Sequence, residues 1–183
     1  MKDIAICFEG INDKDFLQLF LKRLGLDENR VEFFRMGGKS NFFKPAKYQE
    51  LKHNIEAEMI NKVLFMLDVD NEKTDAKFNG LQNTQTEIDK TIAELGFKNV
   101  NVETCLIYDP ETKDGYLESL ILSTIPGEHK KCVNDFLDCS KFKDKTSQKA
   151  ILHQIYKTAY PSCAYDFSHS NFSDLKTKLT NLF

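Results

Sequence analysis

Several features that often identify a protein class are missing from this sequence. Its 183 residues include no tryptophan and no apolar run long enough to cross a membrane, so we expect no membrane partner. The five cysteines form no C-x-x-C pair, and the N-terminus carries no apolar stretch of the kind that directs secretion. Both features favour reduced thiols in a cytoplasmic protein. A G-x-x-x-x-G-K-S/T phosphate loop is also missing, so we expect no P-loop ATPase domain.

The sequence also lacks a strong excess of either charge, since its formal net charge is -3 at pH 7. Such a chain has no general attraction to nucleic acids or anionic membranes. Nucleic-acid binding would need a local patch of Lys and Arg or a bound metal. Hydrophobic residues make up 41% of the chain and charged residues 29%, which is typical of a globular protein.

The most informative stretch is a short apolar run, residues 63–67, that ends abruptly in Asp68-Val69-Asp70. Its length and composition predict a strand buried on both faces of a parallel sheet. Strand residues two positions apart share a side, so we expect Asp68 and Asp70 to project together from the carboxyl end of the strand. Open α/β sheets bind ligands at that end, and two adjacent carboxylates repel each other unless a cation or proton lies between them. This pair is a candidate site for a hard metal ion.

Three further segments have the composition of strands: residues 3–8, 31–35 and 101–108. Amphipathic stretches separate them, and the first of these has Asn12 or Asp13 as its candidate helix cap. Alternating strands and helices predict a compact three-layer, Rossmann-like α/β fold with a mainly parallel four-stranded sheet. The other helices expected in this part are 46–60, 84–95 and 116–122.

The last third of the chain is more charged and helical in pattern, without repeats or a long linker. We predict a single domain over residues 1–183, with a core at 1–125 and a helical C-terminal extension at 126–183 that packs on it. The helices expected in the extension are 130–137, 147–158 and 172–182.

A glycine pair in the segment Met36-Gly37-Gly38-Lys39-Ser40-Asn41 follows the second predicted strand. Glycines let the backbone turn sharply or approach a ligand closely, so Gly37, Gly38 and Lys39 are candidates for binding a phosphate or substrate. The alternative is an ordinary turn with a solvated lysine.

Acidic residues recur at the ends of strands or loops: Glu9, the Asp68/Asp70 pair, and Glu118. Carboxylates are the ligands that Mg²⁺ and Mn²⁺ prefer. A cluster of this kind with one or two metal ions can polarise a phosphodiester and activate a water for attack on it.

These residues resemble a known family. The pattern Phe8-Glu9-Gly10-x-x-Asp13-x-x-Phe16-Leu17, followed by a hydrophobic run and Asp68-x-Asp70, is similar to the Toprim domain of topoisomerases, primases and OLD (overcoming lysogenization defect) nucleases. The loop around Lys39 and the segment Leu117-Glu118-Ser119-Leu120 resemble most the small stand-alone proteins related to OLD nucleases. The resemblance covers residues 3–122.

The resemblance implies roles for individual residues. Glu9 would be a metal ligand and a candidate general acid or base, and Asp68 and Asp70 would be metal ligands. Glu118 would help to hold a second metal, and Asp13 would support the site. A late lysine would offset charge on the phosphate; Lys145 and Lys149 are the candidates, and Lys149 is preferred.

Each role has a structural alternative. Asp13 can cap the first helix, Asp70 can belong to a solvated loop, and Glu118 and Lys149 can be ordinary helix residues. Phe42 and Phe43 can stack nucleic-acid bases, although core packing is the more common role of such residues.

Three functional hypotheses follow. The first is a small Mg²⁺- or Mn²⁺-dependent nuclease acting on DNA or RNA. The second is a non-catalytic Toprim module that binds metal, nucleic acid or a partner protein within a defence or repair assembly. The third is an acidic α/β protein without phosphate chemistry, and it requires every motif match to be accidental.

Overall fold

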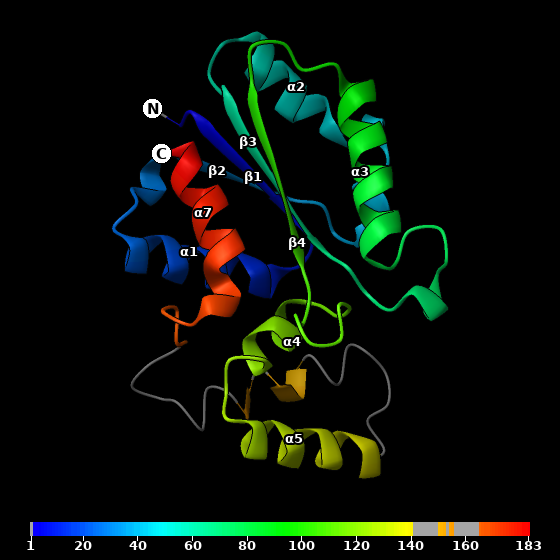
Figure 1. Cartoon of the computed structure of the whole chain (residues 1–183). Coiled ribbons are helices and arrows are strands. Elements are labelled where there is room, and N and C mark those ends of the chain that lie inside the picture. Colours follow the sequence, from blue (N-terminus) through cyan, green and yellow to red (C-terminus); the bar gives the residue numbers. More distant parts are fainter. Residues whose placement is uncertain (1, 141–149, 153, 156–164) are drawn as a thin grey trace.

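The computed structural model describes residues 2–140, 150–152, 154–155 and 165–183 (Figure 1). Its centre is a four-stranded, all-parallel sheet with strand order β2-β1-β3-β4, which confirms the predicted α/β fold. The four strands begin and end close to the predicted positions. They are β1 (Ile4–Phe8), β2 (Val31–Arg35), β3 (Lys62–Asp68) and β4 (Asn101–Ile107).

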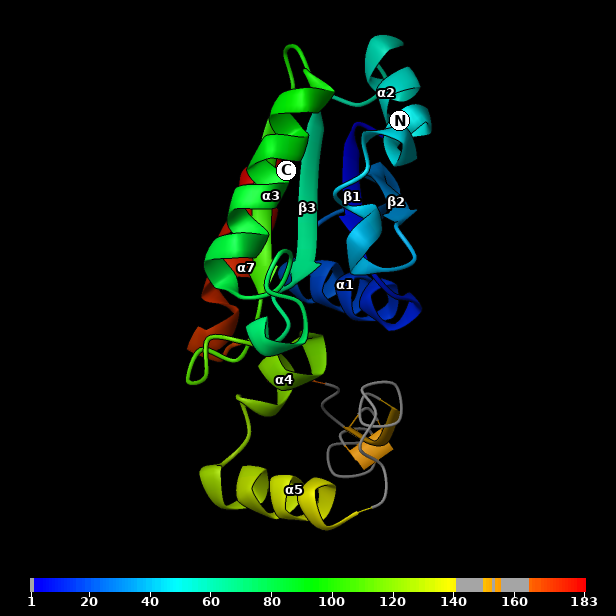
Figure 2. The same ribbon diagram turned by 90° about the vertical axis from the view of Figure 1, so that its right-hand side faces the viewer.

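Helices cover both faces of the sheet, as Figures 1 and 2 show. One face packs against α1 and α7, and the other against α2 and α3. Two further helices, α4 and α5, lie beyond the carboxyl ends of the strands (Figure 1). The helix bounds are α1 (Ile11–Leu24), α2 (Gln49–Glu56), α3 (Leu81–Leu95), α4 (Leu117–Leu122), α5 (Gly127–Cys139) and α7 (Ser173–Leu182).

The central strands are apolar throughout because each face meets a different helix layer. On β1, Ile4, Ile6 and Phe8 point to the α1/α7 side, whereas Ala5 and Cys7 point to the α2/α3 side; all five are buried. Burial of each large side chain contributes about 1.5–3 kcal/mol, so the two central strands anchor the loops that follow them.

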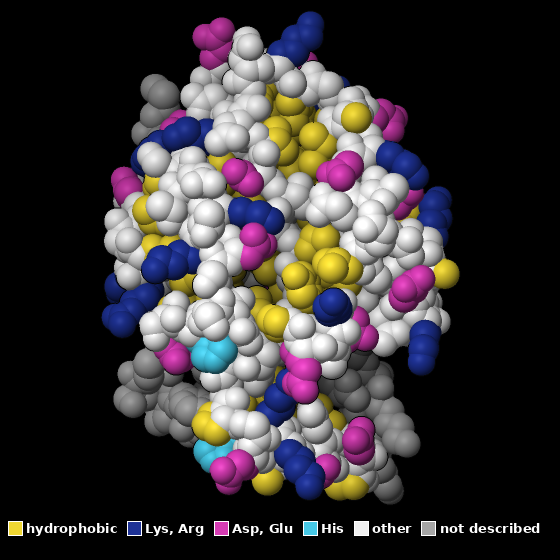
Figure 3. Space-filling model, viewed as in Figure 1, with side chains coloured by type: hydrophobic (Ala, Val, Ile, Leu, Met, Phe, Trp, Pro, Cys, Tyr) yellow, Lys and Arg dark blue, Asp and Glu magenta, His cyan; other side chains and the backbone are white. Residues whose placement is uncertain are grey.

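The C-terminal helix α7 belongs to the same core as the sheet. Leu175, Leu179 and Leu182 are buried in one cluster with β1 and α1. Strand β4 forms one edge of the sheet. Apolar side chains gather along it between α3 and α7 on the face seen in Figure 3.

Some predicted helix bounds were wrong. The expected helix 46–60 is instead a 3-10 turn, Pro45–Tyr48, followed by α2, which ends before the left-handed residue Glu58 (φ +56°). The helix expected from residue 84 begins three residues earlier, directly after Gly80 (φ +87°). The helix expected at 147–158 lies largely outside the described residues. In the described part of the chain, no helix has both the length and the apolar character needed to cross a membrane.

Candidate functional site

The candidate site lies where the chain leaves β1 and β3. These strands are neighbours, yet the chain runs from β1 to β2 on one side and from β3 to β4 on the other. Loops that diverge in this way leave a crevice at the carboxyl edge, the usual ligand site of open α/β sheets. Glu9 directly follows β1, and Asp68 is the last residue of β3. The topology therefore brings two of the predicted acidic residues to neighbouring positions at the carboxyl edge of the sheet.

Asp68 has a fixed orientation. It lies on the same strand face as Leu64 and Met66, and only 3% of its surface is exposed. Its Oδ1 atom accepts a hydrogen bond from the backbone N–H of Leu117 at 3.1 Å. Since Leu117 is the first residue of α4, this bond brings the buried Glu118 to the same region of the molecule.

Asp70 does not continue the strand, so the alternation argument that paired it with Asp68 was wrong at this point. Strand β3 ends at Asp68, and Asp70 has a left-handed backbone (φ +55°). Its N–H donates to the carbonyl of Gly115 at 2.8 Å. The direction of the Asp70 carboxylate is therefore set by a turn that is held by the loop after β4, and not by the two-residue period of a strand.

Lys39 lies beneath this turn and is buried. Its ammonium donates to the carbonyl oxygen of Val69 and to Oγ1 of Thr84, the latter at 3.1 Å. The N–H of Gly80 donates to the same Val69 oxygen at 3.1 Å. Lys39 is therefore not a solvated surface lysine, and these contacts hold the backbone between the two aspartates.

The glycine pair before Lys39 lies beside the end of β1. Gly37 and Gly38 have φ angles of +71° and +136°, which side chains with a Cβ rarely adopt. The Gly37 N–H donates to the carbonyl of Glu9 at 3.1 Å. No other atom lies within 4 Å of the Cβ position at either glycine, so the space above this loop is open.

Asp13 supports the loop that carries Glu9. Helix α1 begins at Ile11, with Gly10 as its N-cap and Asp13 in its first turn. The Asp13 carboxylate is buried, and its Oδ2 accepts the Gly10 N–H at 2.7 Å. The prediction that Asn12 or Asp13 is the N-cap was wrong, because the helix starts earlier and Gly10 is its N-cap; Asp13 instead reaches back from the third helical position to the Gly10 N–H.

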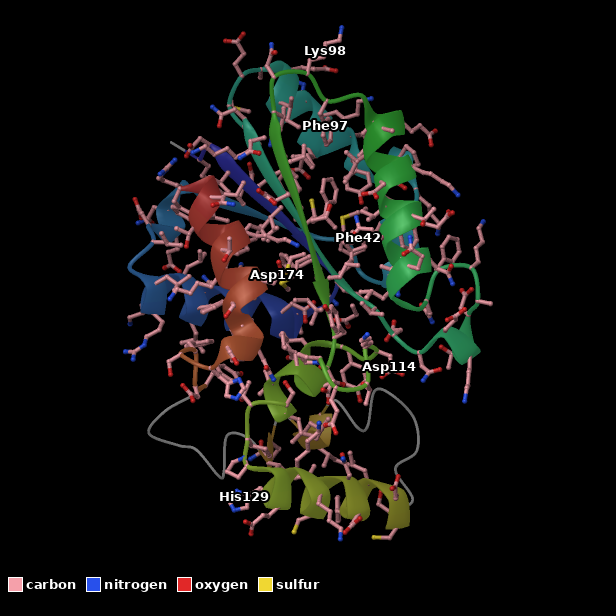
Figure 4. All side chains as sticks on the ribbon, in the orientation of Figure 1. Phe42, Phe97, Lys98, Asp114, His129 and Asp174 are labelled. Atoms are coloured by element: carbon pink, nitrogen blue, oxygen red, sulfur yellow. The ribbon has the colours of Figure 1, made fainter. Side chains whose placement is uncertain are left out.

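A second loop, between β4 and α4, closes over the turn at Asp70, and this contact was not predicted from the sequence. Gly115 in this loop has φ +108°, and a Cβ there would lie 2.7 Å from Oγ of Ser119. The Asn71 amide donates to Oδ2 of Asp114 at 2.6 Å; Asp114 lies at the carboxyl edge in Figure 4. The composition of residues 109–115 is typical of a turn-rich loop, but no local signal in the sequence indicates that this loop contacts Asp70.

Lys130 of α5 anchors the same loop. Its ammonium lies 2.8 Å from Oδ2 of Asp109 and 2.8 Å from Oε2 of Glu111. Burial by itself lowers the pKa of Lys130, but the hydrogen bonds to the two carboxylates outweigh it and raise the pKa. No sequence signal predicts this contact, because Lys130 and Lys131 are two adjacent lysines of an amphipathic helix that the sequence does not distinguish.

The donor set matches the chemistry of a hard cation. Carboxylates from two strand ends and from α4 are the oxygen ligands that Mg²⁺ and Mn²⁺ prefer. Within the ranges that the structure describes, however, no group of three or more His, Cys, Asp or Glu side chains has an arrangement that could hold a metal ion. The candidate lysines Lys145 and Lys149 lie outside those ranges.

Comparison with known proteins identifies a family. The family described as "Protein of unknown function (DUF3226)" matches residues 4–159. The chain belongs to this family. The matched range contains all four strands and the acidic residues Glu9, Asp68, Asp70 and Glu118, whereas α7 lies beyond it. No curated protein and no solved structure matches the chain.

Proposed function

We propose that this protein is a small metal-dependent nuclease that hydrolyses phosphodiesters in DNA or RNA. The observation that carries the proposal is the meeting of Glu9 and Asp68 at the point where the β1 and β3 loops diverge, with α4 bound to Asp68 through Leu117. The resemblance to Toprim domains of OLD nucleases points to the same residues.

In this scheme Glu9, Asp68, Asp70 and Glu118 supply carboxylate oxygens to Mg²⁺ or Mn²⁺. The bound cation would polarise the phosphoryl oxygens and supply a nucleophilic water. Glu9, directly after β1, would also serve as a general acid or base. Lys149 is retained from the resemblance as the residue that offsets charge on the phosphate.

The other residues act by positioning. The Leu117 N–H orients the Asp68 carboxylate by a hydrogen bond. The Lys39 ammonium fixes the backbone by donating to the Val69 carbonyl, and the Gly115 carbonyl accepts the N–H of Asp70. Asp13 fixes the backbone just after Glu9. A ligand set on loops needs such contacts, because small displacements weaken metal binding and catalysis.

The test is calorimetric titration of Mn²⁺ and Mg²⁺ into the wild type and the Asp68→Asn and Asp70→Asn variants. The amide oxygen of an asparagine at position 68 can still accept the Leu117 N–H, so we expect Asp68→Asn to fold normally. Glu94→Gln, an exposed position on α3, is the matched control. The same samples are then incubated with supercoiled DNA and single-stranded RNA.

We expect metal binding and metal-dependent cleavage in the wild type and the control, and loss of cleavage in both aspartate variants. Cleavage by Asp68→Asn at the wild-type rate would contradict the scheme. Failure of the wild type to bind either metal would also contradict it.

The second candidate is a non-catalytic module that binds metal, nucleic acid or a partner protein. It is favoured by the small size of the chain and by its formal net charge of -3, which gives no general attraction to a nucleic-acid substrate. The two candidates differ in turnover, because a binding module can require metal for affinity but leaves the nucleic acid uncut.

A further inference from the structure

Two exposed cations, Lys14 and Arg35, lie on the β2 side of β1. Arg35, the last residue of β2, is exposed and pairs in register with Phe8, one residue before Glu9. Lys14, in the exposed part of α1, places its Nζ 5.6 Å from the ring centroid of Phe33. Phe33 and Arg35 are two residues apart on one strand and share a face. Lys14 and Arg35 therefore flank the same side of the candidate site.

Neither cation is neutralised in the described structure. The ion pairs found among the described residues involve other lysines and Arg30, and none includes Lys14 or Arg35. Lys39, the cation closest in sequence to the glycine pair, is buried beneath Val69. The exposed positive charge on this side of the site thus comes from the strand end and from α1.

The spacing suits a ligand with more than one phosphate. Neighbouring strands lie about 4.8 Å apart, and β1 separates β2 from β3. Arg35 is level with Phe8 and with Met66, so the backbones at Arg35 and at Asp68, two residues further on, are roughly 12 Å apart. A phosphate held at the carboxylates lies next to β1 and β3. The cations on the β2 side are placed to meet a neighbouring phosphate of the same chain.

Two features leave room for such a chain. The space above Gly37 and Gly38, between Arg35 and Lys39 in the sequence, is open. Ile11, the first residue of α1, is 63% exposed next to the Glu9 loop and provides an apolar surface for a sugar or base.

The opposite side of the site is less suited to an anion. A solvent-open cavity of about 710 Å³ lies between the loops after β3 and β4. Its lining carries Lys73 and Lys113 but also Glu72 and Asp114, so its charges cancel. The β2 side is therefore the more favourable path for a phosphate backbone.

We propose that Lys14 and Arg35 bind the phosphate backbone of a single-stranded polynucleotide on the β2 side of the acidic site. This inference rests on the proposed function and makes it narrower, because it names a polynucleotide as the substrate and excludes a mononucleotide. Single-strand binders combine a track of cations with surfaces on which sugars and bases can lie.

The test measures binding of a fluorescently labelled oligothymidylate, about 20 nucleotides long, by anisotropy at increasing salt. The variants are Lys14→Ala, Arg35→Ala, the double variant and Arg35→Glu. Lys22→Ala and Lys98→Ala are controls; Lys98 lies at the opposite end of the sheet from Asp114 (Figure 4). Circular dichroism confirms the fold of each variant.

We expect each single variant to bind roughly tenfold more weakly, as for loss of one charge-assisted hydrogen bond. The double variant should reduce the slope of log K against log salt by about 1.4, because each single-strand phosphate contact contributes about 0.7. Arg35→Glu should bind more weakly than Arg35→Ala. The controls should match the wild type.

A small substrate separates the two proposals. Bis(p-nitrophenyl) phosphate has one phosphodiester and cannot contact the acidic site and the Lys14/Arg35 pair at the same time. The double variant should therefore hydrolyse it at the wild-type rate. If the wild type neither binds metal nor hydrolyses this compound but its oligothymidylate affinity depends on Lys14 and Arg35, the nuclease proposal fails and the binding surface stands. If the double variant binds the oligonucleotide as the wild type does, or the wild type does not bind it, the inference is overturned.

Discussion

Among single residues, Lys39 combines a charged side chain with a buried position. Buried lysines need partners, since an uncompensated charge in the interior is unfavourable by several kcal/mol. The Val69 carbonyl and the Thr84 hydroxyl are such partners. Lys39 thereby joins the loop after β2, the turn after β3 and the start of α3, three segments that are far apart in the sequence. Its position explains how a left-handed residue such as Asp70 is held in place.

The first prediction concerns this lysine. Lys39→Met keeps an unbranched side chain but cannot donate to Val69 or Thr84, so we expect the free energy of unfolding to fall by about 1–3 kcal/mol. Under the proposed function, Mn²⁺ affinity should fall as well. Urea unfolding and calorimetry measure the two effects.

Lys90→Met is the matched control for that substitution. Lys90 is exposed and pairs with Glu87, one helical turn away, so its loss should change the stability by less than about 0.5 kcal/mol. Equal stability of the Lys39 and Lys90 variants would show that the buried contacts of Lys39 do not hold the turn.

At the scale of elements, the loop between β4 and α4 organises the site although it contributes none of the predicted ligands. The carbonyl of Gly115 in this loop accepts a hydrogen bond from the N–H of Asp70. At the start of α4, the N–H of Leu117 donates to the Asp68 carboxylate. Lys130 then ties the loop to α5 through Asp109. The two aspartates after β3 are thus positioned by a segment that comes much later in the chain.

Gly115→Ala tests this arrangement. An alanine would have to adopt φ +108°, and its Cβ would lie 2.7 Å from the Ser119 hydroxyl, so the loop must move. We expect a loss of about 1–3 kcal/mol in unfolding free energy and weaker metal binding, because the Asp70 N–H loses its acceptor. Denaturant unfolding and Mn²⁺ titration measure these changes.

Gly127→Ala is the appropriate comparison. Gly127 begins α5, and a Cβ there meets no atom within 4 Å. Alanine favours the helix, so this variant should be as stable as the wild type or more stable, by up to about 1 kcal/mol. A Gly115 variant that matched it would contradict the proposed role of the loop.

For the molecule as a whole, one contact joins three distant segments at the amino edge of the sheet. Arg30 donates to both carboxylate oxygens of Asp3, at 2.9 and 2.6 Å, and to the carbonyl of Phe183 at 3.1 Å. Its guanidinium also lies 5.3 Å from the Phe183 ring centroid. The starts of β1 and β2 are thereby tied to the end of α7, at the edge opposite to the candidate site.

This contact predicts a pH dependence of stability. The hydrogen bond from Arg30 lowers the pKa of Asp3 below its ordinary value. The stabilisation is therefore fully present above the unfolded-state pKa of about 3.9 and is lost as the pH falls through the lower folded-state value. Asp3→Asn should be less stable than the wild type at about pH 6, and the difference should shrink at about pH 3. Urea unfolding at the two pH values measures it; a difference that grows on acidification would contradict the assignment.

Much of the fold could be predicted because its signals are local. The apolar runs at β1 and β3 and the helix stripes depend on residues a few positions apart, and these determined the strand positions and the α/β class. The same is true of Glu9 and Asp68, which were recognised as residues at strand ends. The strand order is consistent with the pattern but was not contained in it.

The sequence by itself determined which residues form the strands and which acidic residues follow them, because hydrophobic periodicity and backbone preferences act within a few residues. Tertiary structure decided the left-handed turn at Asp70, the burial of Lys39 and the contribution of Gly115 to the site. These features depend on contacts between segments that are distant in the sequence, and such contacts exist only after the sheet and its helices have packed.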